Sequence, residues 1–334
     1  MRKSSKRAKD KLKLKKGMNC LLCRRRPADQ TGSHIVSAFL LTSQIGKRGQ
    51  EKAFLISTNP KQDYSENKGD SGIKEDYIFC RECEKRLSFI ENNYSAEITN
   101  KIEDPQFHQN FPKSSSKHGE YVRCLRIDPI AFTLLIQSNI WRASLSTKEV
   151  YAHFKLPADV EEELRFQLDL FLPETVDHKI SISLNSWIKV VRNCVDYFKF
   201  FPYLILKAEG LSNKEVTFQF FDSESHQPNE IILNEYIILP FFGFDIWKDN
   251  FFEFKDELDA FELMNNKYAE IKIGIITNAR FMQLIDKIQD LASDQRVRNT
   301  YKECIEEFRA KGIPFTLFDI EMCKQAKINS IKVK

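Results

Sequence analysis

The chain has 334 residues, of which 42% are hydrophobic and 29% charged, as in an ordinary soluble globular protein. A chain of this length can bury a complete hydrophobic core without a disulfide framework, and its length predicts about two domains. No apolar run approaches the ~18 residues of a membrane helix and no apolar segment follows the basic start, so we expect a cytoplasmic protein without a secretory signal.

The basic residues are concentrated at the N-terminus. Residues 1–17 contain nine of the 51 Lys and Arg residues and one of the 47 acidic residues, which gives this segment a charge of +8 and the remainder −4. We expect a flexible tail that binds phosphate groups by releasing counterions. A solubility tail or a localisation signal is the alternative interpretation.

Two Cys-x-x-Cys motifs follow the tail, Cys20 with Cys23 and Cys80 with Cys83. Two such pairs supply the four soft ligands of a tetrahedral structural Zn²⁺ site. In a reducing compartment we expect all eight cysteines to be thiols or metal ligands rather than disulfides. The 56 residues between the two pairs are too many for a simple zinc ribbon, so a folded segment is expected between them.

The segment between the pairs contains Ser33-His34-Ile35-Val36. With Cys20-Leu-Leu-Cys23 before it and Phe79-Cys80-Arg81-Glu82-Cys83-Glu84 after it, this motif resembles the HNH endonucleases, also called ββα-metal nucleases. Many members have a first Cys-x-x-Cys, a hairpin strand carrying Asp-His-Ile, and a second Cys-x-x-Cys that opens a short helix. The resemblance covers residues 18–95 and implies a zinc-knuckle domain that hydrolyses phosphodiester bonds.

The resemblance also implies roles for individual residues. His34 matches the general base of the family, and a neutral imidazole can accept a proton from water near neutral pH. Ser33 stands where the family usually has a metal-binding Asp, and a hydroxyl is a weaker ligand than a carboxylate. Glu84 stands where the family often has Asn or His, and its carboxylate could restore the negative charge missing at Ser33. Glu91 follows two helical turns later on the same face.

A catalytic divalent ion, Mg²⁺ or Mn²⁺, held among Ser33, Glu84 and Glu91 would polarise the scissile phosphate. His34 is favoured as the base rather than as a ligand, and Glu84 is a better ligand candidate than Glu91. The alternative is a hydrogen-bonded core histidine beside two solvated surface carboxylates.

Basic residues beside the two cysteine motifs are candidates for holding the nucleic-acid backbone. They are Arg24, Arg25 and Arg26 after the first motif, and Lys85 and Arg86 after the second. Arginine and lysine commonly contact phosphates and thereby position a protein on its nucleic acid. Exposed charges without a binding role are the alternative.

Beyond the motifs, residues 96–120 are polar, include the run Ser114–Ser116 and predict a linker or loop. Helices are predicted after Asp128-Pro129 and after Pro157, because proline favours the first helical position, and a further helix is predicted near Trp187–Phe200. Short apolar or alternating runs predict strands, and a final helix is followed by one more strand-like run. The predicted strands are 203–206, 216–221, 231–239, 271–276 and 315–320, and the final helix is 278–310.

Within the first of these helices, Trp141-Arg142 ends an apolar run and indicates a buried aromatic beside an interface arginine. The predicted fold class is α+β. It comprises an N-terminal ββα-metal zinc-knuckle domain (18–120) and a C-terminal domain (121–334) with a helical first part and a mixed α/β body.

The sequence therefore favours a metal-dependent HNH-type endonuclease that acts on nucleic acid, with DNA preferred over RNA. Residues 121–334 would recognise nucleic acid, a protein partner or a small-molecule signal, and no membrane partner is expected. By analogy, effectors of bacterial defence and mobile-element nucleases have this layout. Two alternatives stay open: a non-catalytic zinc module that binds nucleic acid, and an interaction protein whose zinc site stabilises a protein-binding surface.

Overall fold

The structure is a computed structural model in which part of the chain is described. The described residues are 17–37, 52–55, 66–68, 74–99, 102, 104–116, 119–148, 151, 154–173, 183–194, 201–209, 216–222, 230–233, 235–242, 265, 270–312, 319–320, 322–324 and 326–327. Apart from Gly17, the predicted basic tail lies outside these residues.

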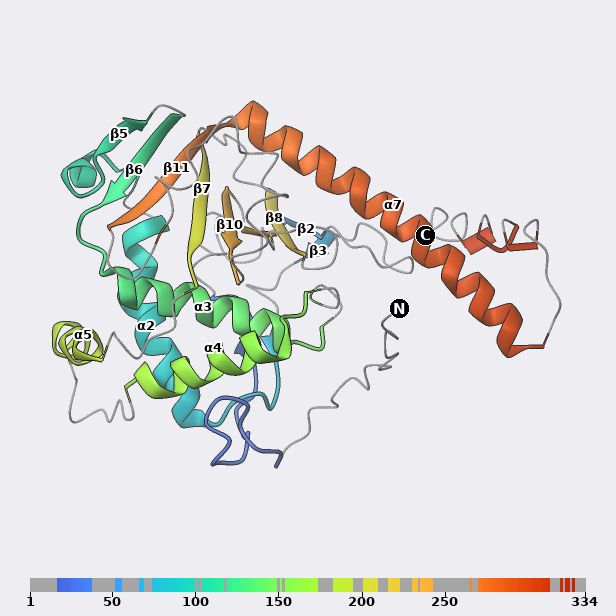
Figure 1. Cartoon of the computed structure of the whole chain (residues 1–334), viewed down its shortest axis with the longest axis horizontal. Coiled ribbons are helices and arrows are strands. Elements are labelled where there is room, and N and C mark those ends of the chain that lie inside the picture. The colour runs from blue at the N-terminus through green and yellow to red at the C-terminus, as the bar shows by residue number, and fades with distance from the viewer. Residues whose placement is uncertain are drawn as a thin grey trace, which may run out of the picture.

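A nine-stranded mixed sheet forms the centre of the molecule, in the order β3-β2-β8-β9-β10-β7-β11-β6-β5 (Figure 1). Its strands are β2 (Lys52–Leu55), β3 (Glu66–Lys68), β5 (Lys113–Ser116), β6 (Gly119–Cys124), β7 (Tyr203–Glu209), β8 (Val216–Asp222), β9 (Glu230–Leu233), β10 (Tyr236–Pro240) and β11 (Ile271–Thr277). Neighbouring strands are antiparallel except for the parallel pairs β11–β7 and β2–β8. The apolar runs of β7 and β10 occupy the interior of the sheet and are almost completely buried.

Helices cover the sheet and connect it to the cysteine motifs. They are α2 (Arg81–Thr99), the 3₁₀ helix η1 (Pro105–Asn110), α3 (Pro129–Leu145), α4 (Ala158–Phe171), α5 (Leu184–Asn193) and α7 (Asn278–Ala310). Figure 1 shows α3 and α4 side by side below the sheet, and α7 running away from it. Among the described helices, none is long and apolar enough to cross a membrane.

The start of α3 follows from its sequence. The Asp128 carboxylate accepts hydrogen bonds from the backbone N–H groups of Ile130 (3.1 Å) and Ala131 (3.0 Å), and Pro129 occupies the first helical position. Nearly every residue of α3 is buried, the polar ones included. This helix therefore lies inside the molecule rather than on its surface.

The α+β class is confirmed, and most predicted elements are present. The helices after Asp128 and Pro157 form as expected, and α7 has the predicted bounds. The helix predicted near Trp187–Phe200 starts at Leu184 and ends at Asn193, and the 231–239 run divides into the hairpin β9–β10. In the last predicted strand, Asp319 and Ile320 are helical, and 315–318 lie outside the described residues.

The predicted linker at 96–120 is wrong. Helix α2 extends to Thr99, η1 follows, and the serine run forms β5 at one edge of the sheet. An edge strand has one unpaired side, so polar residues are tolerated there, and the polarity of this segment reflects its edge position.

The structure shows no break at residue 120, where a domain boundary was expected. That position lies inside β6, and β2, from the segment between the cysteine motifs, pairs with β8 of the C-terminal part. One continuous cluster of buried side chains extends from Cys20 to Ile273. The two predicted domains therefore share a sheet and a core.

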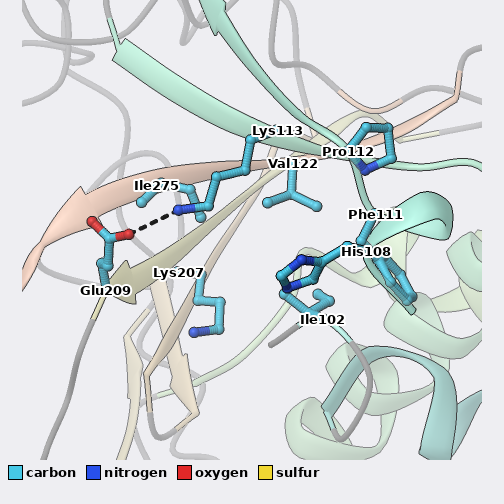
Figure 2. A pocket seen from close by; sticks show the side chains of 9 residues that line it. All are labelled: Ile102, His108, Phe111, Pro112, Lys113, Val122, Lys207, Glu209 and Ile275. Atoms are coloured by element: carbon cyan, nitrogen blue, oxygen red, sulfur yellow. Dashed lines mark hydrogen bonds and ion pairs between the residues drawn. The ribbon is translucent and has the colours of Figure 1, made fainter. Parts of the chain in front are cut away.

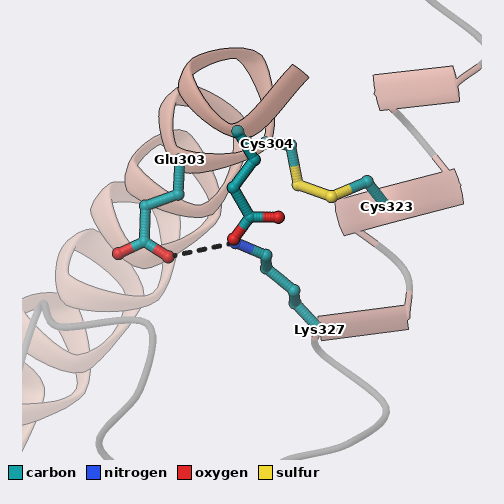
Figure 3. The surroundings of a disulfide bond; sticks show 5 residues. Glu303, Cys304, Cys323 and Lys327 are labelled. Atoms are coloured by element: carbon teal, nitrogen blue, oxygen red, sulfur yellow. Dashed lines mark hydrogen bonds and ion pairs between the residues drawn. A yellow bond between two sulfur atoms is a disulfide. The ribbon is translucent and has the colours of Figure 1, made fainter. Parts of the chain in front are cut away.

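A disulfide joins Cys304 of α7 to Cys323, with their Cα atoms 6.0 Å apart (Figure 3). The prediction that all eight cysteines are thiols or metal ligands is wrong for this pair, because the chain returns beside α7 after Gly312 and brings the two sulfurs together. Lys327 reinforces the contact through Glu303 (3.4 Å) and Glu307 (2.8 Å).

Arg86 connects α2 to the end of α4. Its guanidinium donates to the Asp169 carboxylate (2.7 Å) and to the carbonyls of Leu172 (2.9 Å) and Pro173 (3.0 Å), and its side chain is 4% exposed. Arg25 contacts the same carboxylate at 3.3 Å but is 63% exposed. One acceptor is thus shared by a buried and an exposed arginine.

We predict that Arg86→Ala lowers the free energy of unfolding by about 3 kcal/mol or more, because it breaks a buried ion pair and leaves several carbonyls without a donor. Arg25→Ala, the matched control, should cost under about 1 kcal/mol because its pair is solvated. Urea unfolding of both variants measures the difference, and equal losses would contradict the assignment.

Candidate active site and zinc centre

The four motif cysteines form one buried cluster. Their Sγ atoms all lie within 4.8 Å of one another, and the Sγ atoms of Cys23 and Cys80 are 4.0 Å apart. A tetrahedral ion with Zn–S bonds of about 2.3 Å requires sulfurs about 3.8 Å apart, so both the spacing and the ligand chemistry fit Zn²⁺. These four residues could hold a structural metal ion.

Local backbone geometry builds each half of the cluster. The Cys20–Cys23 turn is closed by the hydrogen bonds Cys20 N to Arg26 O (2.7 Å) and Arg24 N to Cys20 O (2.9 Å), with Arg24 in the left-handed region at φ 55°. Cys83 lies in the first turn of α2, and Leu21 N donates to Ile78 O (2.9 Å) to join the two halves. A hydrogen bond from Cys83 lowers the pKa of the Cys20 thiol, while the same contact raises the pKa of Cys83 and burial raises the pKa of Cys80. Without an ion, one thiolate is therefore stabilised by its neighbours, and a bound cation would be needed to hold the others deprotonated.

A small two-stranded sheet lies beside the cluster. Strand β1 (Ser33–His34) pairs antiparallel with β4 (Lys74–Glu75), and α2 follows β4 in the chain. Ser33 Oγ donates to Glu84 Oε2 at 2.9 Å, which fixes β1 against the first turn of α2. His34 is half-buried on the same short strand. His34, the predicted base, is thus the neighbour in β1 of Ser33, and Ser33 contacts Glu84, the predicted metal ligand.

The Glu84 carboxyl occupies a largely desolvated position. Burial raises its pKa, while the positive charge of Arg142 and the hydrogen bond from Ser33 lower it in part. A carboxylate whose charge is penalised by burial gains when a cation binds nearby. Glu84 is therefore a suitable ligand for a cation brought into this site.

Arg142 of α3 is the residue that connects the site to the body of the protein. Its side chain is 1% exposed, and it pairs with Glu91 of α2 at 2.6 Å. It also donates to the backbone carbonyl of His34 (2.9 Å) and to Ser37 Oγ (3.0 Å). Asn139, one turn earlier, accepts hydrogen bonds from the amide (2.7 Å) and hydroxyl (2.9 Å) of Ser37.

The C-terminal end of α3 holds the second strand of the small sheet. Ser146 Oγ donates to the buried carboxylate of Glu75 at 2.7 Å, and Thr147 N donates to it at 3.1 Å. Helix α3 thus binds β1 through Arg142 and β4 through Ser146. Both strands of the candidate site are fixed by one buried helix.

Glu91 differs from Glu84 in its surroundings. Two turns along α2 from Glu84, it accepts a hydrogen bond from Arg142, and its Oε1 lies 2.8 Å from Ser37 Oγ, whose one hydroxyl hydrogen is shared between Glu91 and Asn139. Within the described part of the chain, the four cysteines are the one group of three or more His, Cys, Asp or Glu side chains spaced to hold a metal. The structure therefore places Ser33 beside Glu84. Among the described residues, Glu84, Glu91 and His34 are not spaced to hold a metal ion together.

The predicted nucleic-acid contacts have varied surroundings. Arg24 and Arg25 make exposed ion pairs with α4, Lys85 pairs with Glu82 (3.6 Å), and Arg26 is exposed. Arg86 departs from the expectation, because it is buried and its guanidinium is used by the end of α4. The Arg86 guanidinium joins α2 to the end of α4 and does not face solvent.

Sequence reasoning missed the roles of Ser37, Asn139 and Arg142 in this site. The contacts between α3 and the His34–Ser37 segment span 102 to 108 residues of chain, and those with Glu91 span 51 and 54, which no local pattern encodes. The one available signal was Arg142 at the end of a largely apolar run, and this pattern indicated an interface but not the residues that Arg142 contacts.

Comparison of the chain with protein-family models, curated proteins and solved structures gives no match.

We predict that the purified protein contains about one Zn²⁺ per chain and that Cys80→Ser loses most of it, because one thiolate of a tetrahedral set is removed. Cys124→Ser, which alters a buried thiol outside the cluster, should retain the ion. Elemental analysis of dialysed protein measures the content, and full zinc in Cys80→Ser would contradict the site.

Proposed function

We propose that this protein is a metal-dependent endonuclease of the HNH type that hydrolyses phosphodiester bonds in nucleic acid, with DNA the favoured substrate. The observation that carries the proposal is the Ser33–Glu84 hydrogen bond. It joins the strand that bears His34 to the helix that opens at the second cysteine pair. Strand, strand and helix around a cysteine cluster is the arrangement that the sequence resemblance implies.

In this proposal His34 accepts a proton from the attacking water, as a neutral imidazole can near neutral pH. Ser33 and Glu84 would supply oxygen ligands for Mg²⁺ or Mn²⁺, ions that proteins often hold through one or two carboxylates together with substrate phosphates. A bound ion would stabilise the negative charge on the phosphate. Glu91, tied to Arg142, acts as a positioning residue rather than as a ligand.

Charged residues near the cysteine cluster support a polyanionic substrate. Arg26 is exposed, and Arg24 and Arg25 form exposed ion pairs with carboxylates of α4. Exposed pairs contribute little to stability, so phosphate groups can replace their carboxylates at low cost. The basic N-terminal residues would add affinity that decreases with salt.

A second candidate is a non-catalytic zinc module that binds nucleic acid. It is favoured by Ser33, which lacks a carboxylate, and by the ion pair that occupies Glu91. This module would bind nucleic acid without a requirement for Mg²⁺ and would not cut it.

We predict metal-dependent cleavage of plasmid or single-stranded DNA by the full chain, and a loss of about 10²-fold or more in His34→Ala, because the base is removed. Glu84→Gln keeps an acceptor for Ser33 but removes the charge, and it should require more Mn²⁺ or lose activity. Zinc content, measured in parallel, should not change. DNA binding without cutting by the wild type under all metal conditions would favour the non-catalytic module.

We predict that Arg142→Lys lowers the cleavage rate about tenfold or more, because lysine cannot contact Glu91 and the His34 carbonyl with one planar group. The KM for DNA and the zinc content should stay near wild type. Asn139→Ala tests the same support of Ser37 without changing charge and should have a smaller effect in the same direction. Unchanged rates in both folded variants would contradict a positioning role.

A further inference from the structure

Helix α7 is fixed to the large sheet at its first turn. It follows β11 directly, and Ile275 of that strand lines a pocket of about 440 Å³ on the sheet (Figure 2). Thr277 Oγ1 accepts a hydrogen bond from the backbone N–H of Arg280 at 3.2 Å, and Phe281 is completely buried. The helix then runs away from the sheet (Figure 1), and residues that follow it in the chain contact its far end (Figure 3). The two ends of α7 are therefore held by different parts of the chain.

The Cys304–Cys323 disulfide has one protected and one accessible side. Cys304 is completely buried on α7, whereas Cys323 is half-buried on the segment that returns beside the helix. A thiolate opens a disulfide by attacking one of its two sulfurs, and the rate depends on which sulfur it can reach. The Cys323 sulfur is therefore the point of attack for a thiol reductant.

The ion pairs beside the disulfide are partly exposed. Lys327 Nζ lies 2.8 Å from a carboxylate oxygen of Glu307 and 3.4 Å from one of Glu303, and the Lys327 side chain is 25% exposed. Ion pairs in contact with water contribute little to stability. Ile320 adds a buried apolar side chain. Opening the disulfide would thus remove a covalent contact that these pairs cannot replace, and would loosen the described residues between 319 and 327 from α7.

The cysteine cluster places an opposite requirement on the same chain. Its four buried sulfurs lie within 4.8 Å of one another and bind a metal ion only as thiolates. The cluster is therefore competent only where thiols are kept reduced. A disulfide found under such conditions is usually a transient catalytic or redox-sensing bond rather than a permanent cross-link. The coexistence of the two groups indicates that the Cys304–Cys323 pair opens and closes while the cluster keeps its thiolates.

We propose that Cys304 and Cys323 form a reversible redox latch, which fixes the C-terminal residues to the far end of α7 and which a dithiol reductant opens. A thiolate of the reductant attacks Cys323 Sγ, the S–S bond breaks, and the electron pair leaves on the Cys304 sulfur, which takes up a proton. The second thiolate of the reductant then attacks the reductant's own sulfur in the mixed disulfide and releases Cys323, which is protonated in turn. Two electrons and two protons pass to the pair, and the reductant becomes a disulfide. The latch does not depend on nuclease activity.

The test treats the oxidised full-length protein with thioredoxin, a protein dithiol kept reduced by its reductase and NADPH. Alkylation and intact mass should show two additional thiols, which peptide mapping assigns to Cys304 and Cys323, while the metal content stays constant. Trypsin cleavage after Lys324 and Lys327 should become about tenfold faster or more, because cleavage follows the opening of the segment. Glutathione disulfide should restore both the original mass and the slow cleavage.

Two variants separate the latch from a general effect of reductant. Cys323→Ser should be cleaved rapidly with or without thioredoxin, whereas Cys194→Ser, which alters a half-buried thiol outside the pair, should behave as wild type. The proposal would be overturned if glutathione disulfide fails to join the two cysteines, or if thioredoxin fails to reduce them in the folded protein. Equal cleavage of the oxidised and reduced forms, or loss of metal together with opening, would overturn it as well.

Discussion

Four buried thiols within 4.8 Å of one another impose the constraint on which the candidate site depends. Cys20 and Cys83 are separated by 62 residues of chain, yet their sulfurs share one cluster. A metal ion that binds such a set contributes its binding energy to folding, because the unfolded chain has no preformed site. Once the first turn of α2 is held beside the Cys20–Cys23 loop, the strand that bears Ser33 and His34 lies within reach of Glu84.

Helix α3 supplies the second constraint. A buried guanidinium is costly unless its charge and donors are satisfied, and Arg142 meets this requirement with Glu91, Ser37 and the His34 carbonyl. The same arginine therefore stabilises the fold and fixes the strand that bears the proposed base. Because α3 packs against α2 and α4 and also contacts Tyr203 of β7 through Phe132 and Thr133, the site is built on the core rather than on a loop, which is what positioning a reaction requires.

Local patterns in the sequence predicted the parts of the structure that local chemistry determines. The Asp128-Pro129 cap, the helix at 278–310 and the cysteine pairs could be recognised because each involves neighbouring residues. The serine run at 114–116 could not be placed, since polarity indicates a loop and an edge strand equally. The shared sheet and the Arg142 network depend on pairings across many residues. The Cys304–Cys323 disulfide depends on where the chain returns beside α7, and the break at Gly312-Ile313-Pro314 indicates the end of the helix but not that return.

The proposed function requires that the strand–strand–helix unit beside the cysteine cluster bind a divalent ion of its own. Anomalous X-ray scattering from crystals of the zinc-loaded protein soaked in Mn²⁺ tests it most directly, because the two metals are distinguished by their absorption edges. The account predicts zinc at the four cysteines and manganese against the Glu84 carboxylate, close to Ser33 and His34. Manganese found elsewhere, or zinc alone with manganese absent from Glu84, would contradict it.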